Sequence, residues 1–266
     1  TPYEISTKAE LLSDADDGLK GLAAFMRKEM ADAHVFGMDE MLLADADTAA
    51  GNNLESIDRM TLTDAAAHAT LSDRADIDVY GEDRSATATK AWMDAASTSH
   101  NSGTNNVALT TALLDAAIEA SLTNGVNYAD LIFLTGHDTY MNMQQLLTKG
   151  GDGGAATILR YDQAQGGAAS QNGVLGQAGL NYDSRVGSYN GIPIFVSQHV
   201  AKDVTARIHL LDLPQLALRV AAPTTYVAND NLAVTQALTK QYALISAMEL
   251  INYRFNTHAS IRDLAT

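Results

Sequence analysis

Histidines are the residues of this chain whose type could bind a metal or transfer protons. Their spacing does not fit the HExxH pattern, in which two imidazoles one helical turn apart bind zinc beside a glutamate base. The chain also has no cysteine, which excludes disulfides and thiolate metal sites. We therefore predict no metal and no cofactor. The seven scattered histidines are His34, His68, His100, His137, His199, His209 and His258.

The segment 76–81 is the nearest approach to a calcium-binding loop. Such a loop needs oxygen ligands at positions one, three, five and twelve, with glycine at position six. The segment has carboxylates at one and three and glycine at six, but Tyr80 and Thr87 occupy positions five and twelve. Because two ligands are missing, we expect no calcium site here.

The stretch 150–187 is rich in glycine, as phosphate-binding loops are. It contains neither GxxxxGK[ST] nor GxGxxG placed between a strand and a helix. The segment 187–191 is not a nucleophile elbow, because Ser188 is displaced from the centre of that motif. We therefore predict no catalytic residue. An enzyme with an unrecognised site in this stretch is kept as an alternative.

Composition limits the class of protein and its partners. The chain has 266 residues, 46% of them hydrophobic, which is enough for one large or two modest domains. Its net charge of −15 disfavours direct nucleic-acid binding. No apolar run has the roughly 18 residues of a membrane span, and the start lacks a signal peptide. Because the first residue is Thr1, we expect a processed product or a trimmed chain.

The acidic excess also indicates a salt-loving source. Aspartates outnumber lysines, and small residues are abundant. At molar salt the Debye length falls to about 3 Å, so that such a charge no longer destabilises the fold. The alternative is an ordinary acidic protein from a mesophile.

Periodicity predicts an α+β chain. Apolar residues at steps of three and four predict a helix from about 16 to 43, a rod of roughly 40 Å. Two further helices, 109–122 and 137–149, flank an apolar strand at 131–135. Other predicted elements are a hairpin turning at Asn190-Gly191, strands at 207–212 and 216–220, and a final tract at 238–255.

The final tract has apolar residues on both faces. So long a two-faced strand should be covered on both sides, with the long helix as one cover. Glu249 lies within it, and a buried carboxylate needs a partner. That partner could come from a neighbouring subunit, or Glu249 could be exposed at a sheet edge.

Five segments add a more specific pattern through their order. Together they resemble the major capsid protein of tailed viruses with the Hong Kong ninety-seven fold, with the ranges 60–100 and 150–185 poorly matched. The segments are TPYEIS at 1–6, DLIFLTGHDTY at 130–140, YNGIPI at 189–194, RIHLLD with LRVAAPT between 207 and 224, and RFN with IRDL between 254 and 264.

The resemblance implies an α+β fold with a peripheral and an axial domain. The peripheral domain would take residues 1–60 and 221–266, with a long spine helix and a long sheet. The axial domain would be mainly 107–220, and 61–106 would be an insertion of uncertain placement. The family's N-terminal arm and most of its extended loop are expected to be absent from this chain, so its cross-linking is not carried over.

The resemblance also implies a function without catalysis. The chain would self-assemble through pentamers and hexamers into the icosahedral head of a tailed double-stranded DNA virus, assembled in the host cytoplasm and located in the virion. Portal or minor capsid proteins would be partners, packaged DNA only an indirect one, and no membrane is involved. An encapsulin-like compartment shell is the second hypothesis. The candidate subunit-interface residues are Glu249, Arg254, Arg262 and Asp263.

Overall fold

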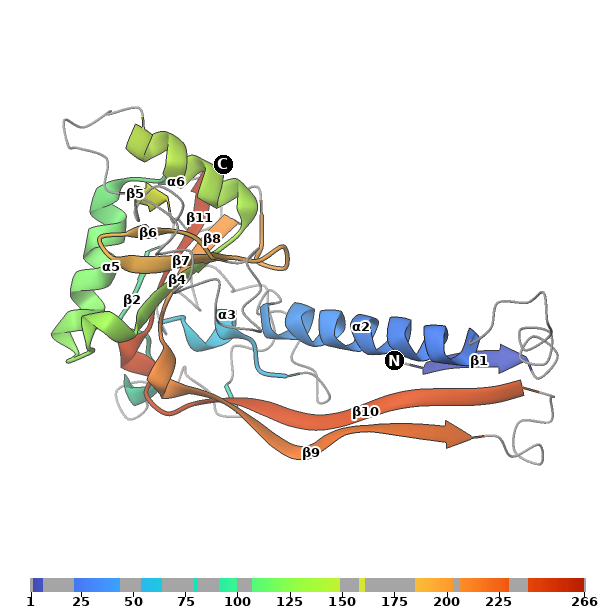
Figure 1. Cartoon of the computed structure of the whole chain (residues 1–266). Coiled ribbons are helices and arrows are strands. Elements are labelled where there is room, and N and C mark those ends of the chain that lie inside the picture. The colour runs from blue at the N-terminus through green and yellow to red at the C-terminus, as the bar shows by residue number, and fades with distance from the viewer. Residues whose placement is uncertain are drawn as a thin grey trace, which may run out of the picture. The chain divides into compact units, whose positions relative to one another are not determined.

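The chain consists of two compact units. The computed structural model describes residues 2–6, 22–43, 54–63, 79–80, 91–99, 107–148, 158–160, 185–202, 206–229 and 239–265. Unit 1 comprises residues 1–42 and 218–250, and unit 2 comprises residues 43–217 and 251–266. Figure 1 shows a long helix with long strands in the first, and a mixed sheet with shorter helices in the second.

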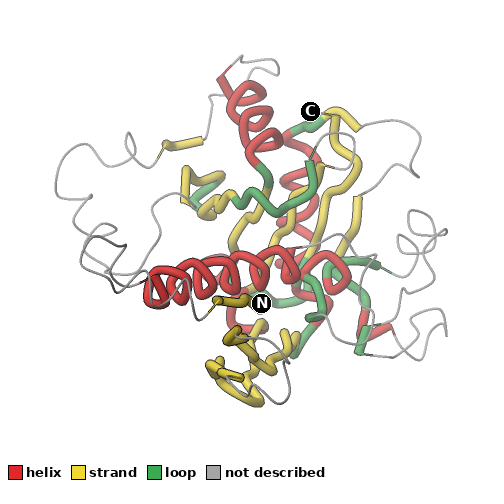
Figure 2. Tube along the Cα trace, turned by 90° about the vertical axis from the view of Figure 1, so that its right-hand side faces the viewer, coloured by secondary structure: helices red, strands yellow, loops and turns green. Residues whose placement is uncertain are grey.

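The described part of unit 1 contains one helix and a three-stranded sheet. The helix α2 spans Leu22–Leu43 and the strands are β1 (Pro2–Ser6), β10 (Thr239–Asn252) and β9 (Leu216–Asn229), in the order β1-β10-β9. β1 pairs antiparallel with β10 and lies beside α2 in both views (Figure 1 and Figure 2). The predicted long helix is thus confirmed to its end at Leu43, while residues 16–21 lie outside the described ranges.

Two polar contacts join α2 to the sheet. The Arg27 guanidinium lies 4.7 Å from the centre of the Tyr226 ring, and His34 Nε2 lies 3.0 Å from Ser246 Oγ. Tyr226 in turn stacks on Tyr242 with a centroid distance of 5.4 Å. The helix therefore covers the face of the β9–β10 pair that carries Tyr226, Tyr242 and Ser246.

The prediction that the last strand tract is covered on both sides was wrong for the single chain. β10 ends at Asn252, and Phe255 begins a 3₁₀ turn (Phe255–Thr257) instead of continuing the strand. Among the β10 residues of unit 1 whose burial is described, only Leu250 is buried, and Ile245 is 55% exposed. A two-faced apolar pattern predicts which faces avoid water, but it does not say whether the same chain supplies the cover.

Unit 2 is built on a sheet with the order β2-β11-β8-β4-β7-β6-β5, and β3 also pairs with β11. β4 pairs in parallel with β7 and antiparallel with β8. β11 lies between β2 and β8. The strands are β2 (Ser97–Ser99), β3 (Val107–Ala108), β4 (Leu131–Thr135), β5 (Ile158–Arg160), β6 (Arg185–Tyr189), β7 (Ile192–Val196), β8 (Ala206–Asp212) and β11 (Ala259–Ala265), and the helices are α3 (Ile57–Met60), α5 (Thr111–Thr123) and α6 (His137–Thr148).

Local signals placed α5 and α6 well. The Thr110 hydroxyl caps α5 by accepting the Leu113 N–H at 3.3 Å, and Gly125 follows its end with φ +81°. The predicted helices at 109–122 and 137–149 and the strand at 131–135 are therefore confirmed within one or two residues.

All seven residues of β8 are buried, and its two faces differ in chemistry. Side chains alternate along a strand, so Ala206, Ile208 and Leu210 share one face. All three belong to the apolar core of unit 2, together with Phe133 of β4 and others. The opposite face carries Arg207 and His209, two polar side chains that need partners.

Like β8, β11 has one apolar and one polar face, and a β-bulge makes this possible. Ala259 and Ile261 belong to the apolar core, and so does Leu264, three residues further on. The pairing register with β8 shifts between Ile261 and Leu264, and Asp263 takes a left-handed φ of 55°. The bulge therefore lets Arg262 lie on the polar face while Leu264 returns to the core.

The hairpin between β6 and β7 turns where the sequence predicted. Asn190 and Gly191 have φ values of +49° and +86°, as the preferred two-residue turn requires at both central positions. A Cβ atom at Gly191 would meet nothing within 4 Å, so the backbone alone favours glycine there.

Gly191→Ala should therefore destabilise the protein by about 1–2 kcal/mol, the cost of an L-residue in the left-handed region. Urea unfolding of the unassembled protein would measure it. Gly37→Ala is the matched control, because Gly37 lies inside α2, also with nothing within 4 Å of the added Cβ. It should stabilise by up to about 1 kcal/mol through helix propensity. Equal effects of the two changes would contradict this account of the turn.

Candidate functional site

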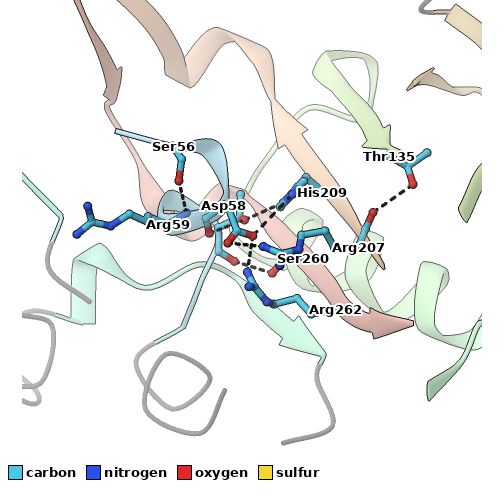
Figure 3. A network of polar contacts seen from close by, with 9 residues as sticks. Ser56, Asp58, Arg59, Thr135, Arg207, His209, Ser260 and Arg262 are labelled. Atoms are coloured by element: carbon cyan, nitrogen blue, oxygen red, sulfur yellow. Dashed lines mark hydrogen bonds and ion pairs between the residues drawn. The ribbon is translucent and has the colours of Figure 1, made fainter. Parts of the chain in front are cut away.

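A buried charge network joins α3 to the polar faces of β8 and β11 (Figure 3). Asp58 of α3 is 1% exposed and accepts from two arginines. Arg207 Nη1 lies 2.5 Å from Asp58 Oδ2, and Arg262 Nη1 pairs with Asp58 Oδ1. We call Asp58, Arg207, His209 and Arg262 the Asp58 network.

Hydroxyl groups hold the short helix α3 in place. The Ser56 hydroxyl accepts the Arg59 N–H at 3.3 Å and begins the helix. At its other end, the Thr61 hydroxyl donates to the Asp58 carbonyl at 3.3 Å, and the Ser260 hydroxyl donates to the Thr61 carbonyl at 2.8 Å. Asp58 is thus fixed between the two arginines by backbone and side-chain contacts together.

Electrostatics decide the charge states in the network. Burial alone would raise the pKa of Asp58, but Arg207 and Arg262 hold it far below its ordinary value. Burial also lowers the pKa of His209 to about 3, although the nearby Asp58 acts in the opposite direction. The network at neutral pH is therefore one carboxylate, two guanidinium groups and a neutral imidazole.

The contacts of His209 agree with a neutral ring. Its Nδ1 lies 3.0 Å from the Thr61 hydroxyl, and its Nε2 lies 3.9 Å from Asp58 Oδ1. Because the Thr61 hydroxyl donates its single proton to the Asp58 carbonyl, its oxygen accepts from Nδ1–H of the neutral ring.

A second buried histidine, His258, is fixed more strictly. Its Nδ1 accepts the Asp212 backbone N–H at 3.1 Å, and its Nε2–H donates to Asn252 Oδ1 at 3.1 Å. That oxygen also accepts the Arg254 backbone N–H at 3.0 Å. Burial lowers the pKa of His258 to about 4. Protonating Nδ1 would place its new N–H against the N–H of Asp212, so the neutral form is required by the contacts as well.

The Asp58 network contains residue types that transfer protons in acid–base sites, but a substrate could not reach them. Its four members are between 1% and 3% exposed, so that no solute reaches them in the folded chain. A buried cluster in which one carboxylate pairs with arginines from two strands joins those strands and specifies which segments meet. We interpret the Asp58 network as a structural element that holds α3, β8 and β11 together.

The structure distributes the predicted interface residues over both units. Glu249 is half-buried in unit 1, where Oε1 accepts the Leu250 N–H at 3.0 Å. Arg254 is exposed in unit 2, where Nη2 donates to the Asn124 carbonyl at 2.6 Å and Nε donates to Asn256 Oδ1 at 3.0 Å. Asp263 is half-buried in the bulge.

Arg262 differs from the other three because it is 3% exposed and ion-paired with Asp58. Its guanidinium is therefore used inside unit 2. Any effect of Arg262 on a neighbouring subunit would act through the shape of β11.

Sequence reasoning missed Asp58. One signal was available: Arg207 and His209 alternate with apolar residues in a strand that reads as buried, and a buried arginine needs a carboxylate. The partner itself lay in a segment without periodicity, 204 positions before Arg262. Nothing local could have paired the two.

The described ranges contain neither a candidate membrane-spanning helix nor a candidate metal-ligand group. Within them, no helix is both long and apolar enough to cross a membrane. In the same ranges no three His, Asp or Glu side chains group as metal ligands.

Comparison by sequence found nothing: no model of a known protein family and no curated protein matches this chain. Comparison of structures found several shells. The capsid asymmetric unit of Cyanophage A-1(L) has a TM-score of 0.58 and 16% identity, over 100% of this chain and 77% of that chain. The capsid of a native GTA particle has a TM-score of 0.58 and 10% identity, over 100% and 71%.

A third similar structure belongs to a different kind of shell. The holo-SrpI encapsulin complex from Synechococcus elongatus PCC 7942 has a TM-score of 0.58 and 12% identity, over 100% of this chain and 72% of that chain. At such identities the likeness shows the fold. The chain therefore has the α+β fold shared by phage capsids and this encapsulin shell, as the sequence resemblance implied.

Proposed function

We propose that this protein is a major capsid protein, which self-assembles into the icosahedral head of a tailed double-stranded DNA virus and is located in the virion. The observation that carries the proposal is the likeness of the whole chain to phage capsid structures. The role is structural and not enzymatic. The alternative enzyme site at 150–187 lies outside the described residues except at 158–160 and 185–187, and gains no support.

Unit 1 supplies independent support for self-assembly. Among its residues with described burial, only Met30 and Leu250 are buried hydrophobic side chains. Exposed large apolar side chains gathered on one helix and three strands are typical of an interaction surface. Seven large hydrophobic side chains of unit 1 are more than a third exposed: Phe25, Val35, Phe36, Leu218, Val220, Val227 and Ile245.

The domain roles follow as part of the proposal. Unit 1 contains the predicted spine helix and long sheet, which supports a peripheral domain. Residues 43–60 and 251–266 of its proposed range 1–60 and 221–266 fall in unit 2, together with most of the proposed axial range 107–220. The insertion 61–106 lies largely outside the described residues. Glu249 and Arg254 are proposed to contact neighbouring subunits directly.

Further partners belong to the same proposal. Portal or minor capsid proteins would contact the shell, packaged DNA would meet it only indirectly, and assembly would take place in the host cytoplasm. A compartment shell is the second candidate, favoured by the likeness to the encapsulin complex. Co-purification of assembled particles with DNA or with a cargo protein would separate the two.

The purified protein should form rings or closed shells, and more of them in molar salt than in dilute buffer. Copies with a net charge of −15 repel one another at low salt, and a Debye length of about 3 Å at molar salt removes that repulsion. Analytical ultracentrifugation and negative-stain electron microscopy across salt and protein concentration would measure this. A strict monomer under every condition would contradict the proposed function, and assembly that salt does not favour would contradict a salt-loving source.

A further inference from the structure

An open pocket of about 520 Å³ lies on the surface of unit 2 along α5. It combines two exposed carboxylates, Asp115 and Glu119, with apolar side chains. None of its lining residues is basic. The lining consists of Asp115, Ile118, Glu119, Leu122, Thr123, Tyr128 and Asn190.

The hydrogen bonds of this pocket leave it acidic. The Tyr189 hydroxyl donates to Asp115 Oδ1 at 2.8 Å, and the Tyr128 hydroxyl donates to the Asn190 carbonyl at 2.5 Å. Burial and the neighbouring Asp115 both raise the pKa of Tyr128 and of Tyr189, so neither phenol loses its proton. The pocket thus offers two carboxylates beside apolar surface, which suits a cationic group attached to an apolar one.

A second surface of unit 2 has the opposite character. Trp92 and Tyr80 both pack edge-on against the buried ring of Phe255, with centroid distances of 5.9 Å and 6.3 Å. Trp92 is 62% exposed, and Tyr253, two residues before Phe255 in the sequence, is 64% exposed. Together with Arg254 they form what we call the aromatic–arginine patch: Tyr80, Trp92, Tyr253 and Arg254. Tryptophan, tyrosine and arginine are the residues most enriched at interface hot spots.

Two hydrogen bonds hold the exposed Arg254 side chain in one conformation. Its bonds to Asn124 and Asn256 use two of its five N–H donors and fix the side chain. A fixed guanidinium loses little conformational entropy on binding. Among the described residues of unit 2 with known exposure, only Lys202 and Arg254 are exposed cations, and Arg254 is the one whose neighbours in the sequence, Tyr253 and Phe255, are aromatic.

We propose that the aromatic–arginine patch of one copy docks into the α5 pocket of the next copy, with Arg254 against Glu119. The inference rests on the proposed shell function, because it names the contact through which copies meet. The two surfaces differ in composition, so each copy offers one of each and two copies can meet through unlike surfaces.

Charge reversal on each side tests the contact. We expect Arg254→Glu and Glu119→Lys each to raise the protein concentration needed for assembly at least tenfold, because like charges would then face each other. A one-to-one mixture of the two variants should assemble again, since alternating copies restore opposite charges. The double variant R254E/E119K should assemble by itself. Lys202→Glu, a reversal of the other exposed cation, should leave assembly unchanged.

The outcomes separate this inference from the proposed function. Wild-type protein that assembles, with both single variants assembling equally well, would overturn the contact and leave the shell function standing. Wild-type protein that never assembles would overturn both. Rescue by the double variant but not by the mixture would place the ion pair within one chain, which also overturns the contact.

Two readouts guard against misfolded variants. Where a reversal unfolds the protein by circular dichroism, the neutral changes Arg254→Gln and Glu119→Gln take its place, and each should still raise the assembly concentration severalfold. Trp92 is the only tryptophan, so its emission reports on the patch directly. Assembly of wild-type protein should shift that emission to shorter wavelength, and an unchanged emission from complete particles would contradict docking at the patch.

Discussion

Asp58→Asn should destabilise the protein by about 3–5 kcal/mol, because it leaves the buried Arg207 and Arg262 without a counter-charge. The amide has the shape of the carboxylate, so the loss measures charge and not packing. Urea unfolding of unassembled protein at neutral pH is the measurement. Glu119→Gln is the matched control in the same unit, an equal chemical change at an exposed side chain, and should alter stability by less than about 0.5 kcal/mol.

A second substitution shows that the arginines cause the loss. Adding Arg262→Met to Asp58→Asn should recover part of the stability, because one buried charge without a partner is removed and an apolar chain fills its place. If Asp58→Asn cost less than about 1 kcal/mol, or if Arg262→Met made the variant still less stable, it would be wrong to describe the network as held together by the charge of Asp58.

Lowering the pH from about 7.5 to about 5.5 should cost about 3 kcal/mol of unfolding free energy, through His209 and His258. Their folded pKa values are about 3 and about 4, against an ordinary 6.5. Groups with a depressed pKa contribute stability that is complete above pH 6.5, and for these bases it is lost as the pH falls, because the unfolded chain binds the protons first. Each histidine contributes about 1.4 kcal/mol over this interval.

Urea unfolding at the two pH values measures this loss, and variants assign it. His258→Gln should reduce the pH-dependent part to about half, whereas His137→Gln, at an exposed position, should leave it unchanged. Asp212 acts in the opposite direction at the acid end, since burial raises the pKa of its carboxyl. Equal stability at both pH values would contradict buried neutral histidines.

Sequence patterns predicted the elements whose signals are local. The strand 131–135 was found because five apolar or β-branched residues stand between turn signals, and the hairpin because Asn190-Gly191 favours positive φ twice. β9 was predicted to end at 220 but runs to Asn229. Pro223 and two threonines interrupt its apolar pattern, and they are tolerated because β9 lies at the edge of its sheet.

Partners distant in sequence could not be predicted in the same way. Arg262 was placed among the candidate interface residues as one charge in a C-terminal segment, and only the fold shows that Asp58 accepts from it. The exposed faces of α2 and β10 illustrate the same limit. Ile245 lies on an apolar face of the predicted strand tract and Phe36 lies in the predicted long helix, yet the chain that contains them leaves both more than half exposed.

The position of β11 sets an order of events during translation. This strand, residues 259–265, lies between β2 and β8, and it brings Arg262 to an aspartate made 204 residues earlier. While a ribosome still holds residues 259–265, the sheet of unit 2 stays divided and Asp58 lacks one of its two arginines. Contacts so far apart in sequence make folding slow. A nascent copy therefore completes the unit that bears Arg254 and the α5 pocket only after β11 has left the ribosome.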